Sequence, residues 1–402
     1  MARPGPGGPE PLDVAIVGGG LVGASLAVAL RPLGLRVALI ERGLPPAAEP
    51  AWDERSIALN LASRAICGDL GLWPAIEPEA EPILATHISE RGRFGVARFD
   101  AASRGLEALG YNVPVRAIGR TALDAALATD TVECIAPDTV ESLAADADGI
   151  GLRLASGREL RARLLVAADG AQSTVRALHG IGARHDDYRQ TAVIGAVRFE
   201  RHHRQVAYER FTPEGPLAVL PKPDGACAVV WTVGHERAEQ QLGWDEAEYL
   251  RQLHAVFGHR LGRPLEAGRR FGYPLQRVMA DSLVAPRTVF IGNAAQTLHP
   301  VAAQGFNLGL RDVAELADCL AAAGDPGADE SLARYAAARS DDRVAISNFT
   351  DQLVWLFSNR VPGLSQMRHL GLLALDLAPP LKQRVMAQNL GLQARPPASG
   401  LA

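Results

Sequence analysis

The feature that most constrains the fold is a glycine triplet set between two short apolar runs near the N-terminus. The first apolar run, at residues 13–17, is followed at once by Gly18, Gly20 and Gly23 in the pattern G-x-G-x-x-G. A helix-compatible stretch leads to the second apolar run, which ends at Glu41. Strand, glycine turn, helix, strand and acid in this order predict a dinucleotide-binding βαβ unit.

Each residue type in this unit has a physical role in holding a dinucleotide. Gly18 permits a tight turn and Gly20 lets the backbone approach a pyrophosphate, whereas Gly23 lets helix and strand pack closely. Glu41, at the end of the second strand, can accept hydrogen bonds from ribose hydroxyls. A purely structural glycine turn is the alternative, but the flanking elements and the acid favour a nucleotide site.

The segment after this unit departs from an NAD-type half-sheet, because no third strand follows promptly. The chain runs through a Pro/Ala-rich loop to residues 53–59, and a helix is predicted at 60–70. Arg55 lies on this loop, where it could reach a cofactor; a surface ion pair explains it equally well. Residues 83–115 are Pro-rich and favour β structure.

Two further strand ends carry small or acidic turn residues. The apolar run at 164–168 ends in Asp169-Gly170, and the run at 289–291 ends at Gly292. Residues 304–307 (QGFN) then open a helical pattern. Free N–H groups at such a helix N-terminus can approach an anion or a flat ligand. Turns of this kind therefore end strands near residues 18, 169 and 292.

Residues 185–280 differ in character from the rest. Strands are predicted at 193–199, 206–211, 217–220, 226–233 and 269–274, with a helix at 244–259. Pro and Gly turns between them indicate a mostly antiparallel sheet that forms a second domain. Its aromatic residues could wall a substrate pocket, although core packing is the default for any one of them: Tyr208, Phe211, Trp231, Phe271 and Tyr273.

The C-terminal part is predicted to be helical. One helix is expected through Arg343, and the tail at 344–392 has apolar residues at helical spacing, broken by Pro362, Pro379 and Pro380. Such a stripe usually packs on its own protein. A membrane-facing patch stays open as the alternative.

Composition excludes several classes of function. The formal net charge of −4 offers no basic surface for nucleic acid. The 4 cysteines are far apart and form no C-x-x-C, so neither a metal site nor a redox dithiol is indicated. The first strand follows a Pro/Gly-rich tail without a secretory signal, and no apolar run approaches the ~20 residues of a membrane span. We expect a cytoplasmic protein, or one held peripherally at the inner face of the membrane if the tail faces lipid.

The order and spacing of the turns resemble those of the FAD-dependent aromatic hydroxylase family over essentially the whole chain. Longer segments are similar to the hydroxylases of ubiquinone biosynthesis, in particular to those acting on 2-polyprenyl-6-methoxyphenol: 91–100 (RGRFGVARFD), 107–111 (EALGY) and 292–300 (GNAAQTLHP). The broad family usually has Gly-Asp at the third turn, where this chain and the ubiquinone subgroup have Gly-Asn. Relatives also commonly have glycine where this chain has Ala303.

The resemblance implies an α/β fold with a discontinuous, Rossmann-like FAD-binding domain, a mostly antiparallel β-sheet substrate domain laid over the flavin, and a C-terminal helical part. The implied ranges are 1–82, 117–184 and 281–343 for the FAD-binding domain, 83–116 and 185–280 for the substrate domain, and 344–402 for the helical part. By the same resemblance, the residues expected to hold FAD are Gly18, Gly20, Gly23, Glu41, Arg42, Arg55, Arg120, Asp169, Gly292, Asn293, Gln304, Gly305 and Asn307.

The activity implied is the hydroxylation of a phenol ring in ubiquinone biosynthesis. NAD(P)H or another donor reduces FAD, the reduced flavin takes up O2 as a hydroperoxide, and an electron-rich phenol attacks it. The turn at Asp169 is expected to help NAD(P)H bind, since no second G-x-G-x-x-G opens another βαβ unit. The helix N-terminus at Gly305 suits the negative charge of reduced flavin. His299 is the one candidate for polar help at the ring, with a structural histidine as the alternative.

The partners implied are a polyprenylated phenol, O2 and other proteins of ubiquinone biosynthesis, with peripheral membrane contact through the C-terminal helices. Nucleic acid is not expected. Two other functions stay open: a sister hydroxylase acting at another ring position, and a non-catalytic FAD-binding accessory protein.

Overall fold

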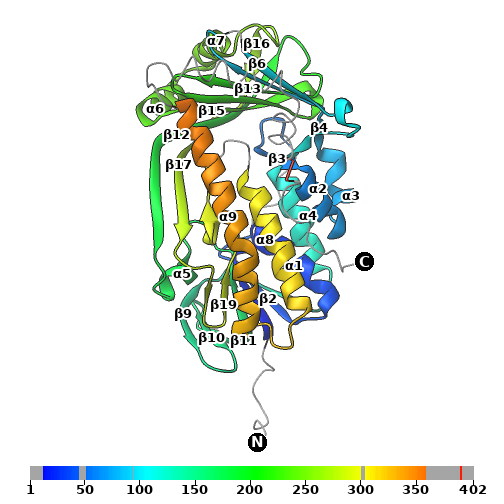
Figure 1. The fold of residues 1–402 in the computed structure, drawn as a ribbon, viewed down its shortest axis with the longest axis vertical. Coiled ribbons are helices and arrows are strands. Elements are labelled where there is room, and N and C mark those ends of the chain that lie inside the picture. Colours follow the sequence, from blue (N-terminus) through cyan, green and yellow to red (C-terminus); the bar gives the residue numbers. More distant parts are fainter. Residues whose placement is uncertain (1–11, 45–50, 94, 300–303, 359–389, 392–402) are drawn as a thin grey trace, which may run out of the picture.

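A mainly parallel sheet forms the lower end of the molecule in Figure 1, a computed structural model that describes residues 12–44, 51–93, 95–299, 304–358 and 390–391. Its strands run in the order β18-β19-β11-β1-β2-β8, and β10 and β9 extend it from β11. Their bounds are β1 Leu12–Val17, β2 Val37–Ile40, β8 Val132–Ile135, β9 Val140–Ala145, β10 Ile150–Leu154, β11 Glu159–Ala167, β18 Val284–Ala285 and β19 Thr288–Phe290. The central strands are apolar and buried, as parallel strands covered on both faces must be.

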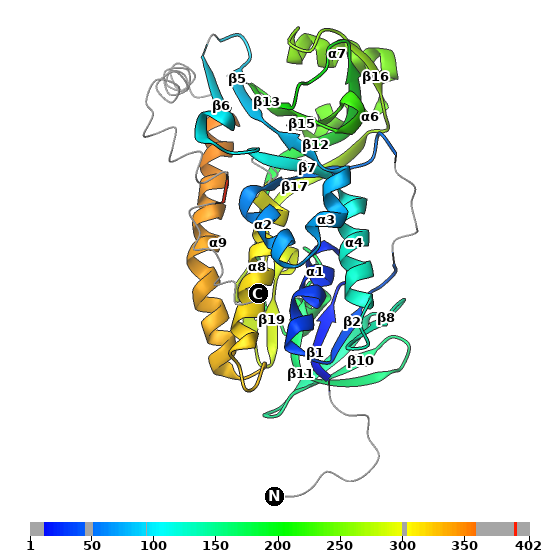
Figure 2. The same ribbon diagram turned by 90° about the vertical axis from the view of Figure 1, so that its right-hand side faces the viewer.

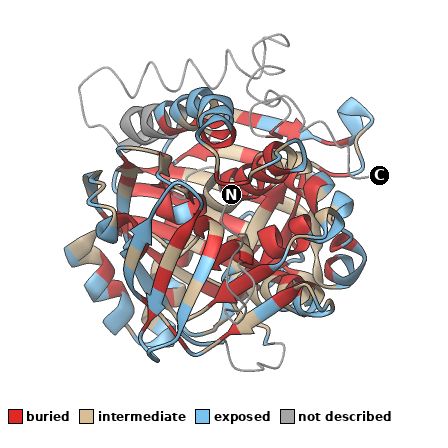
Figure 3. Cartoon of the chain, turned by 90° about the horizontal axis from the view of Figure 1, so that it is seen from below, coloured by how far each residue is buried: buried red, intermediate tan, exposed pale blue. Residues whose placement is uncertain are grey.

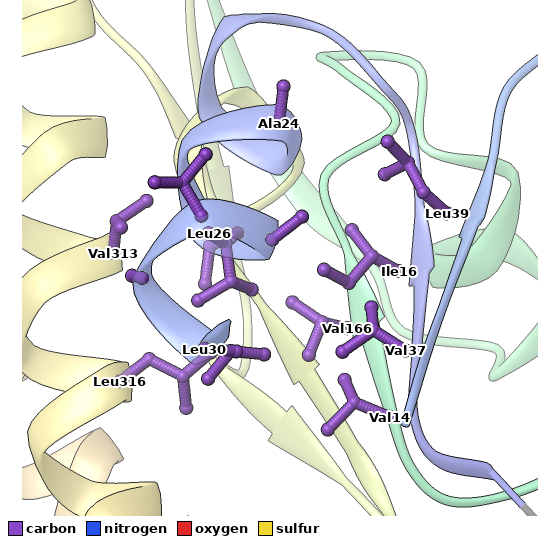
Figure 4. Close-up of a cluster of buried hydrophobic side chains, with 14 of the residues drawn as sticks. Val14, Ile16, Ala24, Leu26, Leu30, Val37, Leu39, Val166, Val313 and Leu316 are labelled. Atoms are coloured by element: carbon purple, nitrogen blue, oxygen red, sulfur yellow. The ribbon is translucent and has the colours of Figure 1, made fainter. Parts of the chain in front are cut away.

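Helices cover this sheet and form the core with it. In Figure 4, Leu26 and Leu30 of α1 lie between the strand residues Val14 and Ile16 and residue Val313 of α8. Each of these side chains is fully buried, and burying one leucine stabilises the fold by about 1.5–3 kcal/mol. The helices of this end are α1 Leu21–Leu30, α2 Leu61–Asp69, α3 Trp73–Ile76, α4 Val115–Leu127, α5 Thr174–Leu178, α8 Gln304–Ala321 and α9 Asp329–Ser358. Figure 3, seen from below, shows buried strands at the centre and exposed residues on the outer helix surfaces.

A second, mostly antiparallel sheet forms the upper end. Its order is β20-β17-β12-β15-β14-β13-β5-β6, with β16 beside β12. Only β13 and β5 pair in parallel. The bounds are β5 Ala85–Glu90, β6 Val96–Asp100, β12 Ala183–Phe199, β13 Val206–Thr212, β14 Gly215–Pro221, β15 Ala226–Gly234, β16 Pro264–Ala267, β17 Phe271–Ala280 and β20 Gln296–Thr297. Helices α6 (His235–Gly243) and α7 (Glu246–Phe257) cover its outer face, and α8 and α9 approach its inner face (Figures 1 and 2).

A small sheet lies between the two ends. It contains β3 (Ser56–Asn60), β7 (Gly110–Pro114) and β4 (Glu81–Ile83) in that order. β7 therefore pairs with β3 and β4 and not with the upper sheet. Short 3-10 turns complete the chain: η1 Arg31–Leu33, η2 Glu77–Glu79, η3 Ala102–Arg104, η4 Pro223–Gly225 and η5 Gly292–Ala294.

The α/β class expected from the sequence is confirmed, and the largest differences lie in polar segments. β12 begins at Ala183, about ten residues before the predicted strand, and α6 has no predicted counterpart. Charged residues supply the early part of β12: Asp186 pairs with Arg277 of β17 at 2.6 Å. A polar strand of this kind is stabilised by its neighbour and not by an apolar pattern. None of the described helices is long and apolar enough to cross a membrane.

Candidate functional site

The N-terminus of α1 is shaped by glycines that leave no room for a side chain. Gly18 has φ +105°, and a Cβ built on it would overlap the Ala168 carbonyl. A Cβ on Gly23 would overlap the Gly18 carbonyl oxygen. Gly20 is exposed, has no described atom within 4 Å of a Cβ position, and precedes a helix that lacks a side-chain cap. Two glycines therefore close the turn, and the third leaves the N–H groups of α1 open to an anion.

Glu41 lies at the carboxyl end of β2, beside this turn. One carboxylate oxygen accepts a hydrogen bond from the Gly19 N–H at 2.5 Å, and the other accepts from the Gly43 N–H at 3.2 Å. Arg42, the next residue, is exposed. The carboxylate is thus held facing the glycine turn, where ribose hydroxyls are expected in a βαβ nucleotide site.

Asp169 lies against the same turn because β1 and β11 pair with Val17 opposite Ala167. Its Oδ2 accepts a hydrogen bond from the Val175 N–H at 3.1 Å. Its Oδ1 is buried and has no hydrogen-bond partner among the described residues. A buried carboxylate oxygen without a partner is costly, so this atom is suited to accept a bond from a ligand.

Arg176 links the second turn to the third. Its buried guanidinium donates to the Ala171 carbonyl and to the Ala294 carbonyl, each at 2.8 Å. Ser173 caps α5 by accepting a hydrogen bond from the Arg176 N–H at 3.0 Å. The serine cap is recognisable in the sequence, whereas the contact with Ala294, far along the chain, has no sequence signal.

The third turn is held by Asp312 of α8. Gly292, with φ +57°, donates its N–H to Asp312 Oδ2 at 2.9 Å, and Gln296 Nε2 donates to the same oxygen at 2.7 Å. Arg339 Nε of α9 donates to Oδ1 at 2.8 Å. Asp312 is itself buried. One carboxylate therefore joins the turn to two helices.

A charge network extends from Asp312 along the two helices. Arg339 also pairs with Asp342 at 2.7 Å, and Asp342 accepts from Arg311 at 2.8 Å. Arg343 donates to the Ala295 carbonyl at 3.1 Å. Sequence reasoning missed this network, because charges on a helix resemble a solvated face until the neighbouring helix is in place.

The N-terminus of α8 faces the same region as the turns. The helix begins at Gln304, and no described atom lies within 4 Å of a Cβ position on Gly305. Asn307 Oδ1 accepts from the Asn60 N–H, and its Nδ2 donates to the Ala58 carbonyl, both at 3.0 Å. The Asn307 amide therefore anchors α8 to β3 and α2, and the backbone of this first turn is left to meet a ligand.

His299 is buried at the end of the third turn. Its exposed fraction is 1%, and its ring packs edge-on against Tyr188 with the centroids 4.9 Å apart. Burial lowers the pKa of His299 to about 4, so the ring is neutral at pH 7. Asn293, earlier in the turn, is exposed. The side chain of Gln304 and residues 300–303, including Ala303, lie outside the described residues.

Two of the arginines predicted to hold FAD lie away from the three turns. Arg55 is exposed, and its guanidinium lies 4.9 Å from the centroid of the Tyr273 ring. Arg120, on α4, is exposed and pairs with Asp124 at 3.5 Å. Neither guanidinium is hydrogen-bonded to the described residues of the turns. Arg55 instead lies between β3 and the upper sheet, and Arg120 lies on a helix that packs against α1.

These residues fit the FAD that the resemblance implies. The uncapped N–H groups of α1 suit its pyrophosphate, Glu41 suits a ribose, and the open first turn of α8 suits the flavin ring. The second turn adds the buried Oδ1 of Asp169, which has no partner among the described residues. The described residues hold no group of three or more His, Cys, Asp or Glu side chains arranged to bind a metal ion.

Comparison with known proteins shows the family of this chain. The FAD binding domain family matches residues 11–350. A ubiquinone hydroxylase, UbiL, of Rhodospirillum rubrum is 38% identical over 94% of this chain and 89% of its own length. The 3-demethoxyubiquinol 3-hydroxylase of Escherichia coli is 35% identical over 95% of this chain and 99% of its own.

Solved structures share the fold at lower identity. PqsL of Pseudomonas aeruginosa superimposes with a TM-score of 0.75 at 24% identity, covering 90% of this chain and 99% of that one. The p-nitrophenol 4-monooxygenase PnpA of Pseudomonas putida does so with a TM-score of 0.79 at 19% identity, covering 96% and 99%. On its family match and its curated relatives, this protein belongs to the FAD binding domain family and, within it, to the flavin-dependent monooxygenases that include the ubiquinone-biosynthesis hydroxylases.

Proposed function

We propose that this protein hydroxylates the ring of a polyprenylated phenol, with 2-polyprenyl-6-methoxyphenol as the first candidate substrate. The observation that carries the proposal is the accessible apolar surface on the inner face of the upper sheet. Phe271 and Tyr273 of β17 are 44% and 36% exposed, and their Cα partners are Ile194 and Ala192 of β12. Aromatic rings left accessible on the face turned towards the glycine turns suit a flat ring with an apolar tail.

In the proposed reaction FAD, when bound, supplies the activation of O2, and NAD(P)H supplies the electrons. The protein's own contribution is binding, orientation and exclusion of water. The α1 N-terminus and Glu41 hold the nucleotide part, and the first turn of α8 offers N–H groups where negative charge develops. The upper sheet covers the ring and keeps water from it.

A second candidate substrate is 3-demethoxyubiquinol, favoured by the 35% identity to the Escherichia coli enzyme of that name. Strains blocked at each ring hydroxylation separate the candidates. Expression of this chain should restore ubiquinone in one strain and clear the phenol accumulated there, as measured by mass spectrometry. Rescue of a strain blocked at another step would identify a different substrate. If the protein binds FAD but rescues none of the strains, a non-catalytic accessory role would be favoured.

The sequence division into FAD-binding, substrate and C-terminal helical regions forms part of this proposal, as does the role of His299 as a candidate for polar help at the ring. We also propose that the C-terminal region contacts lipid or a partner protein of the same pathway, at the cytoplasmic face of the membrane. Most of that region lies outside the described residues. Truncation before Pro362 should leave FAD content unchanged and lower turnover of long-tailed substrate in vesicles. Equal turnover by the truncated and full-length proteins would contradict a contact of the C-terminal region with lipid or a partner protein.

A further inference from the structure

Several inner-face positions of the upper sheet are more accessible than their neighbours on the outer face. On one face, residues packed beneath α7 are at most 1% exposed: Val193, Leu217, Val219, Val229 and Trp231. Their sequence neighbours on the inner face keep accessible surface: Ile194, Ala218, Leu220 and Val230. Adjacent residues of a strand point to opposite faces. These inner-face residues therefore keep accessible surface, as the rings of Phe271 and Tyr273 also do.

Glu209 of β13 lies on this inner face. Its neighbours point the other way: the Tyr208 ring packs against Phe257 with the centroids 5.5 Å apart, and Arg210 Nε donates to the Val256 carbonyl of α7 at 2.8 Å. Because side chains alternate along the strand, Glu209 is directed towards the inner face. It is half-buried there, with some surface still accessible.

The described neighbours of Glu209 are mainly apolar. Its Cα partners on the adjoining strands are Ala218 and Ile88. Glu90, the partner of Phe211, is the one charged side chain that β5 places on the same face. β14 and β6 place none beside it, and the described arginines Arg339 and Arg343 of α9 are bonded near the third turn.

No described residue forms a hydrogen bond or an ion pair with the Glu209 carboxylate. Burial raises the pKa of Glu209 to about 7, and no charged neighbour among the described residues contributes to this shift. A carboxylate in apolar surroundings without a partner destabilises a fold. Such a group, with part of its surface accessible, is a candidate for contact with a ligand that brings its own donor.

A polyprenylated phenol offers one strong hydrogen-bond donor, its ring hydroxyl, on an otherwise apolar molecule. We propose that Glu209 is a catalytic residue that binds this hydroxyl and accepts its proton, an inference that rests on the proposed function. The phenol O–H bond breaks, the proton moves to a Glu209 carboxylate oxygen, and the electron pair stays on the phenol oxygen. The ring becomes more electron-rich for oxygen transfer, and the proton returns to the hydroxylated product.

The test compares Glu209→Gln with wild type and with Glu214→Gln, an exposed glutamate in the β13–β14 turn. Each protein is purified with FAD and supplied with a short-chain polyprenyl phenol. Glu209→Gln should keep its FAD content and its rate of flavin reduction by NAD(P)H. Its hydroxylation kcat should fall by roughly 10²-fold or more, the contribution typical of general base catalysis. The acid limb of the wild-type pH profile near pH 7 should disappear, and Glu214→Gln should match wild type.

Thermal unfolding provides a readout that does not depend on turnover. A carboxyl whose folded pKa is raised destabilises the fold as pH rises through its unfolded value towards its folded one. The Tm of Glu209→Gln should therefore exceed that of wild type at pH 8, and the difference should shrink towards pH 5. Glu214→Gln should show no such trend.

The outcomes separate the two claims. A wild type that hydroxylates no polyprenylated phenol would overturn the proposed function, and the role of Glu209 with it. An active wild type matched within about threefold by Glu209→Gln, with an unchanged pH profile, would overturn only the role of Glu209. A Glu209→Gln Tm equal to or below that of wild type at pH 8 would contradict the unpartnered carboxylate on which the inference stands.

Discussion

Replacing Asp312 by asparagine is the sharpest test of how the third turn is held. The change keeps the size of the side chain and removes its charge. An aspartate accepts all three hydrogen bonds, from Gly292, Gln296 and Arg339. An asparagine presents one acceptor oxygen and one NH2 group, so at least one of these donors meets another donor.

The expected loss of stability follows from the burial of the ion pair between Asp312 and Arg339. Removing one partner of a buried ion pair destabilises a protein by about 3–5 kcal/mol. We expect about 3 kcal/mol, the lower end of that range, because Asp342 still pairs with Arg339 at 2.7 Å. An unfolding entropy of about 2.1 cal/mol/K per residue amounts to about 0.8 kcal/mol/K for 402 residues. The Tm should therefore fall by about 4 °C.

The assay is thermal unfolding followed by circular dichroism, with FAD affinity measured by flavin fluorescence. Asp312→Asn should lower both the Tm and the affinity for FAD, because the turn at Gly292 loses the carboxylate that holds it. The matched control is Asp341→Asn, an exposed aspartate on α9, which should change stability by less than about 0.5 kcal/mol. A Tm within about 1 °C of wild type and an unchanged FAD affinity would refute the reasoning, since 1 °C corresponds to only about 0.8 kcal/mol here.

Three further changes probe the first turn and His299. Gly23→Ala should yield protein without FAD, because the added Cβ overlaps the Gly18 carbonyl oxygen; normal flavin content would contradict the close packing of α1. Glu41→Ala should raise the Kd for FAD by roughly 10- to 100-fold, the loss of hydrogen bonds to a charged group, measured by titration of the apoprotein. The pKa of His299 is about 4 in the fold, against about 6.5 for an unperturbed histidine, so its contribution to stability is complete above pH ~6.5 and is lost as pH falls towards 4. Across that range wild type should lose about 3 kcal/mol more than His299→Gln, measured by urea unfolding at each pH; parallel curves would mean that the ring is not buried neutral.

The βαβ unit could be predicted from the sequence because its chemistry is local. Gly23 is required by its close approach to Gly18, five residues before it, and the apolar runs on either side of the turn are long enough to identify as strands. The same holds for the strand-turn pattern at Asp169 and Gly292. Each turn is marked by residues that lie next to it in sequence.

Roles that depend on side-chain direction were less predictable. Asn307 has the residue type and position of a cofactor ligand, yet its amide is occupied by Asn60 and Ala58. Arg120 is exposed on α4, where it pairs with Asp124. A motif places the backbone of such residues; the partners of their side chains come from other elements.

The sequence by itself determined the dinucleotide-binding unit, the α/β class and the turns that end its strands, because glycine geometry and apolar periodicity act over short distances. Only the tertiary structure decided that Asp312 anchors the third turn, that Arg176 joins two turns, and that Glu209 faces the accessible side of the upper sheet. Each of these features depends on contacts between elements that lie far apart in the sequence. Whether a charged residue is solvated, paired or buried without a partner depends on what packs against it, and no local pattern of residues carries that information.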